Sequence, residues 1–107
     1  APYWDLGFPA QLKTYIENIY VTGIVSAYND HGQSYGLCRA RSLTYITTAG
    51  GAYDPRFSFD YLTAMAKEYF GIRETRLIYA ECLDICGNDP EAILQSAIDQ
   101  IERSADR

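Results

Sequence analysis

The stretch Leu43-Thr44-Tyr45-Ile46-Thr47, followed by Thr48-Ala49-Gly50-Gly51, decides the fold of this 107-residue sequence. Its β-branched and aromatic residues predict a short strand, and the paired glycines cannot continue it. Apolar residues at helical spacing between Ser58, a candidate helix cap, and Gly71 predict a helix. Residues 76–80 predict a second strand. A strand, a helix and a strand in succession form a right-handed βαβ unit with parallel strands.

Further elements flank this unit on both sides. Apolar residues recur at helical spacing over 9–22, and residues 24–37 predict a small hairpin. Asn88 begins another candidate helix, with Glu91 three residues later as in a capping box, and the polar tail 104–107 is expected to fray. Parallel strands need helices on both faces, so the order predicts part of a doubly wound α/β sheet, which has about five strands when complete.

Composition and charge indicate a globular protein and argue against some classes of binding partner. An apolar content of 48 % with 21 % charged residues is typical of a globular protein. The net charge of −5, without a basic stripe, argues against nucleic acid as a partner. No apolar run approaches the roughly 20 residues that cross a bilayer, so no membrane partner is expected. Cys38, Cys82 and Cys86 lack the spacing of a disulfide framework or metal site, which favours free thiols and a cytoplasmic location.

Ligands of open α/β sheets bind outside the carboxyl ends of the strands. The stretch 47–53 follows the first visible strand, and the stretch 2–6 is expected to follow a strand that is not in this sequence. Paired glycines allow close approach of a flat ligand, and aromatic side chains can cover its ring. A glycine pair after a strand is, taken alone, more often a simple turn.

Four motifs occur in the chain in a fixed order: Pro2–Lys13; Val21–Tyr28 with Gly32 and Gly36-Leu37; Thr47–Tyr53; and Phe70–Ile72 with Ala80-Glu81. They resemble, respectively, the patterns Pro-x-aromatic-Asn-Phe-x-x-Pro-x-x-Leu-Lys, Gly-x-x-Phe-x-Tyr…Gly…Gly-Leu, Thr-Ser-Arg-Gly-Gly-x-x and Phe-x-Gly-Ile…Ala-Glu-Gly. These patterns belong to FMN-dependent NADH azoreductases and their NAD(P)H quinone reductase relatives. The resemblance covers nearly the whole chain.

The resemblance implies a flavodoxin-like, three-layer α/β/α fold. Residues 1–107 would be the C-terminal part of one domain, without its N-terminal strand and FMN phosphate loop. It also implies FMN as cofactor, NADH or NADPH as cosubstrate, a quinone, azo or nitro compound as electron acceptor, and a homodimer. No catalytic side chain is implied, because the cofactor carries the chemistry. The implied cofactor-binding residues are Pro2, Tyr3, Trp4, Asp5, Leu6, Thr47, Thr48, Ala49, Gly50, Gly51 and Tyr53.

Three positions depart from the family patterns. Asp5 replaces a common Asn, Ala49 replaces a common Arg, and Cys82 replaces the Gly after Ala-Glu. Glu81 is expected to have a structural role. Two other interpretations of the chain stay open: a non-catalytic, flavodoxin-like FMN electron carrier, and an inactive fragment that packs through an exposed strand edge.

Overall fold

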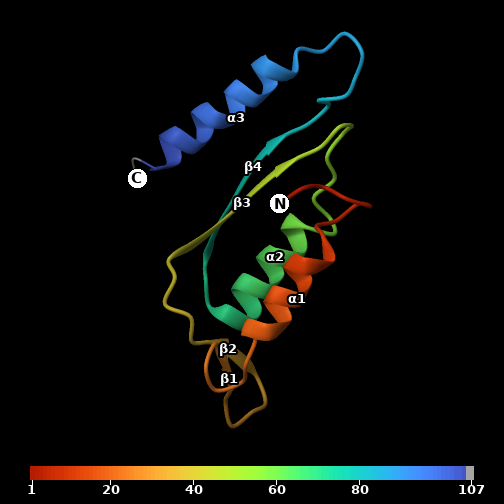
Figure 1. Cartoon of the computed structure of the whole chain (residues 1–107). Coiled ribbons are helices and arrows are strands. Elements are labelled where there is room, and N and C mark those ends of the chain that lie inside the picture. The colour runs from red at the N-terminus through yellow and green to blue at the C-terminus, as the bar shows by residue number, and fades with distance from the viewer. Residues whose placement is uncertain (106–107) are drawn as a thin grey trace.

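The structure of the chain is a computed structural model that describes residues 1–105 (Figure 1). A parallel pair of strands, β3 (Ser42–Thr48) and β4 (Glu74–Ala80), lies between two helical layers. The ladder runs in register from Ser42 opposite Glu74 to Thr48 opposite Ala80. The predicted βαβ unit is therefore confirmed, although β4 begins two residues before the predicted start at residue 76.

The two faces of the strand pair bury separate apolar clusters. Tyr45 of β3 and Leu77 of β4 pack toward α1 (Ala10–Ile19) and α2 (Phe59–Met65). Ile78 and Ala80 of β4 pack against α3 (Pro90–Ala105) on the other face. Successive side chains of a strand point to opposite faces, so β4 contributes to both clusters. This is the predicted three-layer α/β/α arrangement with flanking helices.

The first helix is shorter than the predicted range 9–22. Its last residue is Ile19, and Tyr20 adopts an extended backbone with φ −77° and ψ 96°. The Tyr20 ring packs against the rings of Tyr69 and Phe70, with centroid distances of 5.4 and 6.1 Å. This packing requires the chain to leave the helix before Gly23, so the predicted helix end is wrong by three residues.

The predicted hairpin is confirmed. Strands β1 (Ser26–Tyr28) and β2 (Ser34–Gly36) pair antiparallel and extend away from the rest of the molecule (Figure 1). Backbone contact joins the hairpin to the body, because Gly36 lies directly against the backbone of Phe70 and Gly71. Gly36 and Gly71 have no side chains, so the two backbones can approach this closely.

The helix between β3 and β4 changes character along its length. After α2 the chain makes a π-helical turn, η1 (Ala66–Phe70), and ends at Gly71 with a left-handed φ of 79°. The glycine stop agrees with the sequence, whereas the π-helical turn has no signal in it. Ser58 precedes α2 but makes no side-chain cap bond, so its predicted capping role is wrong.

The last helix begins where it was expected, but with a different cap. Asp89 Oδ1 accepts hydrogen bonds from the backbone N–H groups of Glu91 and Ala92, at 3.1 and 3.3 Å. Asn88 instead donates to the carbonyl of Cys82 at 3.0 Å, so the predicted capping box is wrong. The helix includes residues 104–105, contrary to the expected fraying, and residues 106–107 of that tail lie outside the described residues.

Candidate functional site

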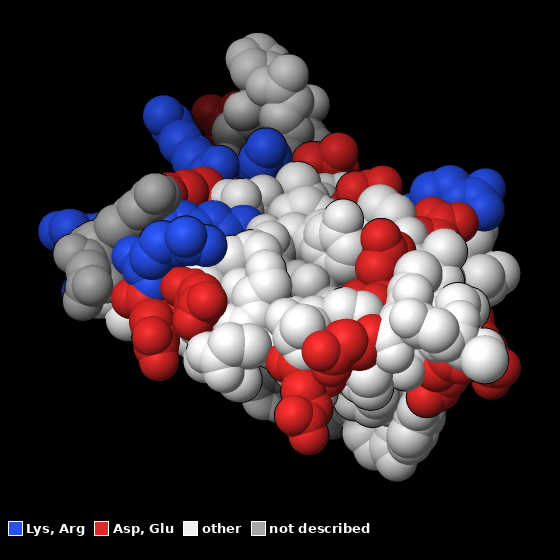
Figure 2. All heavy atoms as spheres, turned by 90° about the horizontal axis from the view of Figure 1, so that it is seen from above, with Lys and Arg blue, Asp and Glu red and all other residues white. Residues whose placement is uncertain are grey.

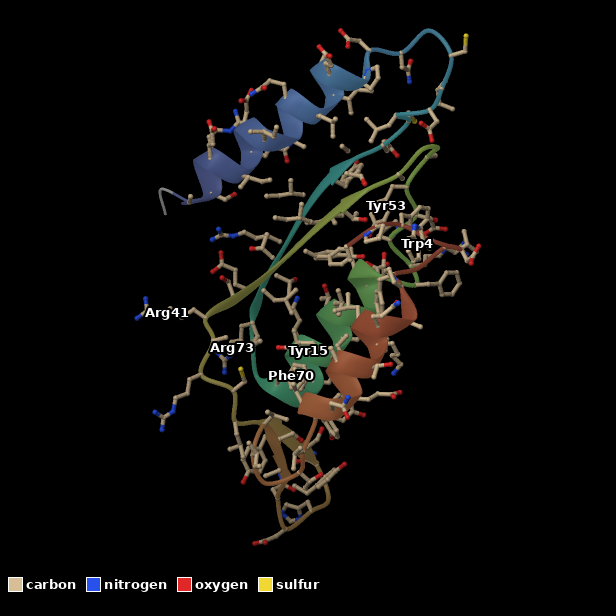
Figure 3. All side chains as sticks on the ribbon, in the orientation of Figure 1. Trp4, Tyr15, Arg41, Tyr53, Phe70 and Arg73 are labelled. Carbon is tan, nitrogen blue, oxygen red and sulfur yellow. The ribbon has the colours of Figure 1, made fainter. Side chains whose placement is uncertain are left out.

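Two stretches far apart in sequence meet at the carboxyl end of β3. Pro2 forms a parallel bridge with Thr48, and the terminal amine of Ala1 donates to the carbonyl of Ile46 at 2.6 Å. The rings of Tyr3 and Tyr53 are in edge-to-face contact, 5.0 Å between centroids. Figure 3 shows Trp4 and Tyr53 in the same region, from the N-terminal segment and the loop after β3. The structure thus brings together the two stretches that the sequence placed there.

The first stretch is a tight turn. The N–H of Trp4 donates to the Gly7 carbonyl and the N–H of Gly7 to the Trp4 carbonyl, both at 2.9 Å. Asp5 and Leu6 between them have φ values of 50° and 72°. Two positive φ values enclosed by reciprocal bonds are the mark of a type I′ turn. Asp and Asn both tolerate this backbone, which explains why Asp5 can replace the Asn of the family pattern.

This turn presents its apolar side chains to the surface. Trp4 keeps 59 % of its surface exposed and Leu6 52 %. Neither side chain is part of the two buried clusters. Trp4 therefore stands beside the loop after β3 as an exposed aromatic surface, and not as a core residue.

The second stretch is anchored through its carbonyl groups. The carbonyls of Ala49, Gly50 and Gly51 accept from the N–H groups of Leu83, Asp84 and Cys82, at 3.3, 2.9 and 2.8 Å respectively. The N–H groups of Gly50 and Gly51 have no hydrogen-bond partner within residues 1–105. The loop consequently offers two adjacent backbone donors to a ligand.

The glycines of this loop differ in their surroundings. A side chain on Gly50 would collide with the Asp84 carboxylate, whereas a Cβ on Gly51 would meet nothing within 4 Å. Gly51 therefore borders open space, as a close approach to a flat ligand requires. Thr47 and Ala49 are buried, with 3 % and 4 % exposure. Although both are predicted site residues, they line the interior of the loop and do not face that space.

Tyr53 is held by four contacts. Its backbone N–H donates to Glu81 Oε2 at 2.7 Å, which is the structural role expected of Glu81. Its hydroxyl lies 2.6 Å from Ser58 Oγ, and its ring contacts those of Tyr3 and Tyr79, the latter at 5.3 Å. Burial raises the pKa of the Tyr53 phenol, so the side chain is a neutral hydrogen-bonding group near pH 7.

Seen from above, the molecule has an uncharged central area with both acidic and basic side chains around it (Figure 2). A cavity of about 580 Å³ lies nearby, between the end of β4 and α3, and Tyr79, Glu81 and Cys82 line it. Sequence reasoning did not single out Tyr79, and it indicated Ser58 only as a helix cap, not as a partner of Tyr53. The only signal for Tyr79 is its place next to the carboxyl end of a strand.

No cluster of three or more His, Cys, Asp or Glu side chains is arranged to hold a metal ion in residues 1–105. Over the same residues, no helix has the length and apolar character needed to cross a membrane.

Comparison with known proteins gives close relatives. The chain is 37 % identical over 110 residues to the FMN-dependent NADH:quinone oxidoreductase 2 of Clostridium acetobutylicum, covering 98 % of this chain and 54 % of that protein. It is 38 % identical over 112 residues to the FMN-dependent NADH:quinone oxidoreductase of Caldicellulosiruptor saccharolyticus, covering 100 % and 55 %. The chain thus spans about half the length of these relatives.

A solved structure shares the fold. The FMN-dependent NADH-azoreductase from Bacillus anthracis str. Ames Ancestor, in complex with FMN, superposes with a TM-score of 0.85 at 30 % identity, over 99 % of this chain and 52 % of that one. The family model described as flavodoxin-like fold matches residues 1–105. With parallel strands between two helical layers and a ligand-accessible loop at their carboxyl ends, the chain belongs to the flavodoxin-like fold family.

Proposed function

We propose that the protein is an FMN-dependent NAD(P)H oxidoreductase, and that this chain supplies the loops that contact the flavin ring. The observation that carries the proposal is the pair of N–H groups of Gly50 and Gly51, which have no partner within residues 1–105, with open space beside Gly51 and with Trp4 and Tyr53 close by. A flavin accepts hydride from NADH or NADPH and passes two electrons to an acceptor. The residues present fit such a group.

Each site residue then has a definite task. Gly50 and Gly51 would donate hydrogen bonds to the part of the flavin that becomes negative on reduction. Backbone donors fixed before the reaction stabilise that charge without reorganisation. Trp4 and Tyr53 cover the ring and exclude water. Asp5 contributes its turn-forming backbone, because its carboxylate would disfavour negative charge on the ring.

The proposal extends to a larger protein. Residues 1–107 would be the C-terminal part of one flavodoxin-like domain, and preceding residues would supply a helix N-terminus for the FMN phosphate. Support comes from the match to about half of each FMN-dependent relative. We further propose a cytoplasmic enzyme that acts on quinone, azo or nitro compounds, with neither nucleic acid nor a membrane as partner.

A homodimer is also part of the proposal. The hairpin region exposes large apolar residues, including Ile24 at 69 %, Tyr28 at 54 % and Tyr35 at 48 %. Aromatic residues are enriched at protein interfaces. A second copy is the partner that the family resemblance implies for this surface.

The test uses a protein of the relatives' length that contains this chain. Purified with FMN and mixed with NADH and menadione, it is expected to oxidise NADH, followed at 340 nm. Gly51→Val should weaken FMN binding at least tenfold, about 1.4 kcal/mol, because it fills the open space. The urea midpoint should stay unchanged, since a Cβ at this position meets no neighbour.

Loss of NADH oxidation and loss of FMN binding would mean different things. Flavin retention without NADH oxidation would favour the electron carrier. A protein that retains no FMN contradicts the proposed function.

A further inference from the structure

A buried group of hydroxyls lies where β3 ends and α2 begins. Ser58 is completely buried, and its Oγ is 2.6 Å from the Tyr53 hydroxyl. Tyr45 and Thr47, on the same face of β3, are 5 % and 3 % exposed. The hydroxyl oxygens of both are buried without a hydrogen-bond partner in residues 1–105. This hydroxyl cluster consists of Tyr45, Thr47, Tyr53 and Ser58.

Stability alone does not account for the hydroxyl cluster. Serine before a helix normally caps it by accepting a backbone N–H, yet Ser58 makes no such bond and α2 has no side-chain cap. A buried hydroxyl without a partner costs free energy that an apolar side chain of similar shape avoids. Ser58 therefore does not cap α2, and it does not pack as an apolar side chain would. Its hydroxyl bonds to that of Tyr53 instead.

The bond to Ser58 fixes a residue whose ring connects the two loops of the candidate site. The Tyr53 ring touches Tyr3 of the first stretch at 5.0 Å and Tyr79 of β4 at 5.3 Å. Glu81 holds the backbone of Tyr53 at 2.7 Å. The backbone is thus fixed by Glu81, and the far end of the ring is fixed by Ser58.

We propose that Ser58 is a positioning residue: through its hydroxyl it holds the Tyr53 ring between Tyr3 and Tyr79, and so keeps the two loops in the arrangement that receives the flavin. The effect on flavin binding rests on the proposed function, whereas the contacts of Ser58 with Tyr53 do not. Ser58 itself is buried beneath the loop, and its effect on the two loops passes through Tyr53.

The experiment separates ring position from flavin binding. Wild type, Ser58→Ala, Tyr53→Phe and the double variant are compared, with Thr63→Ala as control. The control removes another partly buried hydroxyl pair, Thr63 with Thr75 at 3.4 Å, away from the site. Nuclear Overhauser contacts between the rings of Tyr3 and residue 53 are measured in the flavin-free chain. FMN dissociation constants are measured in the protein of the relatives' length.

Ser58→Ala is expected to weaken the ring contacts and FMN binding about tenfold, and Tyr53→Phe to do the same. The double variant should bind FMN no more weakly than either single variant, because both remove the same hydrogen bond. Thr63→Ala should match wild type. Unchanged ring contacts in Ser58→Ala, or losses that add in the double variant, overturn the inference.

Two further outcomes are also decisive. If Ser58→Ala does not fold, Tyr53→Phe carries the test, because it keeps the ring and lacks only the hydroxyl. Wild-type ring contacts and FMN affinity in Tyr53→Phe would then overturn the inference. If the wild type binds no FMN, the proposed function fails, while the ring contacts still report whether Ser58 positions Tyr53.

Discussion

At the residue scale, Cys82 shows how backbone conformation explains a departure from a family pattern. Its φ is 60°, in the left-handed region that glycine adopts without strain. The resembled pattern has Gly at this position. The chain therefore retains the loop conformation with a residue that is poorly suited to it, directly beside the carbonyl of Gly51 to which Cys82 donates.

Replacing Cys82 with Gly is expected to stabilise the chain by about 1 kcal/mol. A left-handed residue with a Cβ costs about 1–2 kcal/mol, and the greater freedom of glycine in the unfolded chain offsets about 0.4–1 kcal/mol of that gain. Urea unfolding measures the change. Cys86→Gly is the matched control, since Cys86 is exposed and has no positive φ; a lower midpoint for Cys82→Gly contradicts this account.

The sequence located the candidate residues along the chain but not the direction of each side chain. Gly50, Gly51 and Tyr53 are where the patterns placed them, whereas Thr47 and Ala49 point inward. Thr47 lies in β3 and Ala49 directly follows it. Because side chains alternate along a strand and this alternation continues to Ala49, both side chains point into the core. Ser58 was assigned to a local helix cap, and its actual partner depends on tertiary packing that no local rule contains.

At the element scale, one glycine contact brings the hairpin directly against the backbone of the body. A Cβ on Gly36 would overlap the backbone of Phe70 and Gly71, which cannot move aside as a flexible side chain can. We therefore expect Gly36→Ala to destabilise the chain by about 1–3 kcal/mol, the usual cost of overpacking.

The loss of stability should be specific to the contact between Gly36 and the backbone of Phe70 and Gly71. Gly51→Ala serves as the control, because it adds the same methyl group in open space. Amide hydrogen exchange should show loss of protection in β1 and β2 for Gly36→Ala only. Equal stability of the two variants would show that the hairpin does not rest on this contact.

Element types were predictable from the sequence, and element ends were less so. Every predicted helix and strand is present, because apolar periodicity reflects burial. The end of α1 and the π-helical turn η1 depend on where Tyr20 and Phe70 pack, which periodicity does not specify. The cap of α3 moved by one residue because Asn88 found a partner in the Cys82 carbonyl.

At the scale of the whole molecule, the chain is extended. Its radius of gyration is 16.1 Å, against about 13 Å for a compact domain of 100 residues. Ile46 of β3 and Leu94 and Ile98 of α3 keep 42 %, 38 % and 44 % of their surface exposed. An α/β sheet buries such residues under further strands and helices.

The isolated chain is therefore expected to self-associate. Exposed apolar surface of this kind is removed from water by contact between copies. Light scattering coupled to size exclusion should give a mass that rises with protein concentration above that of the 107-residue monomer. A monomer mass at every concentration would contradict this expectation.

The position of α3 after the other described elements has a consequence during synthesis. Proteins emerge from the ribosome N-terminus first, at about 5–20 residues per second. The strand pair and both helices of one layer are complete before the 16 residues of α3 appear. Until then the Ile78 and Ala80 side of β4 lacks the cover that α3 provides. A premature stop codon before Pro90 would leave the product permanently without α3. Such a product would be a target for chaperones and proteases.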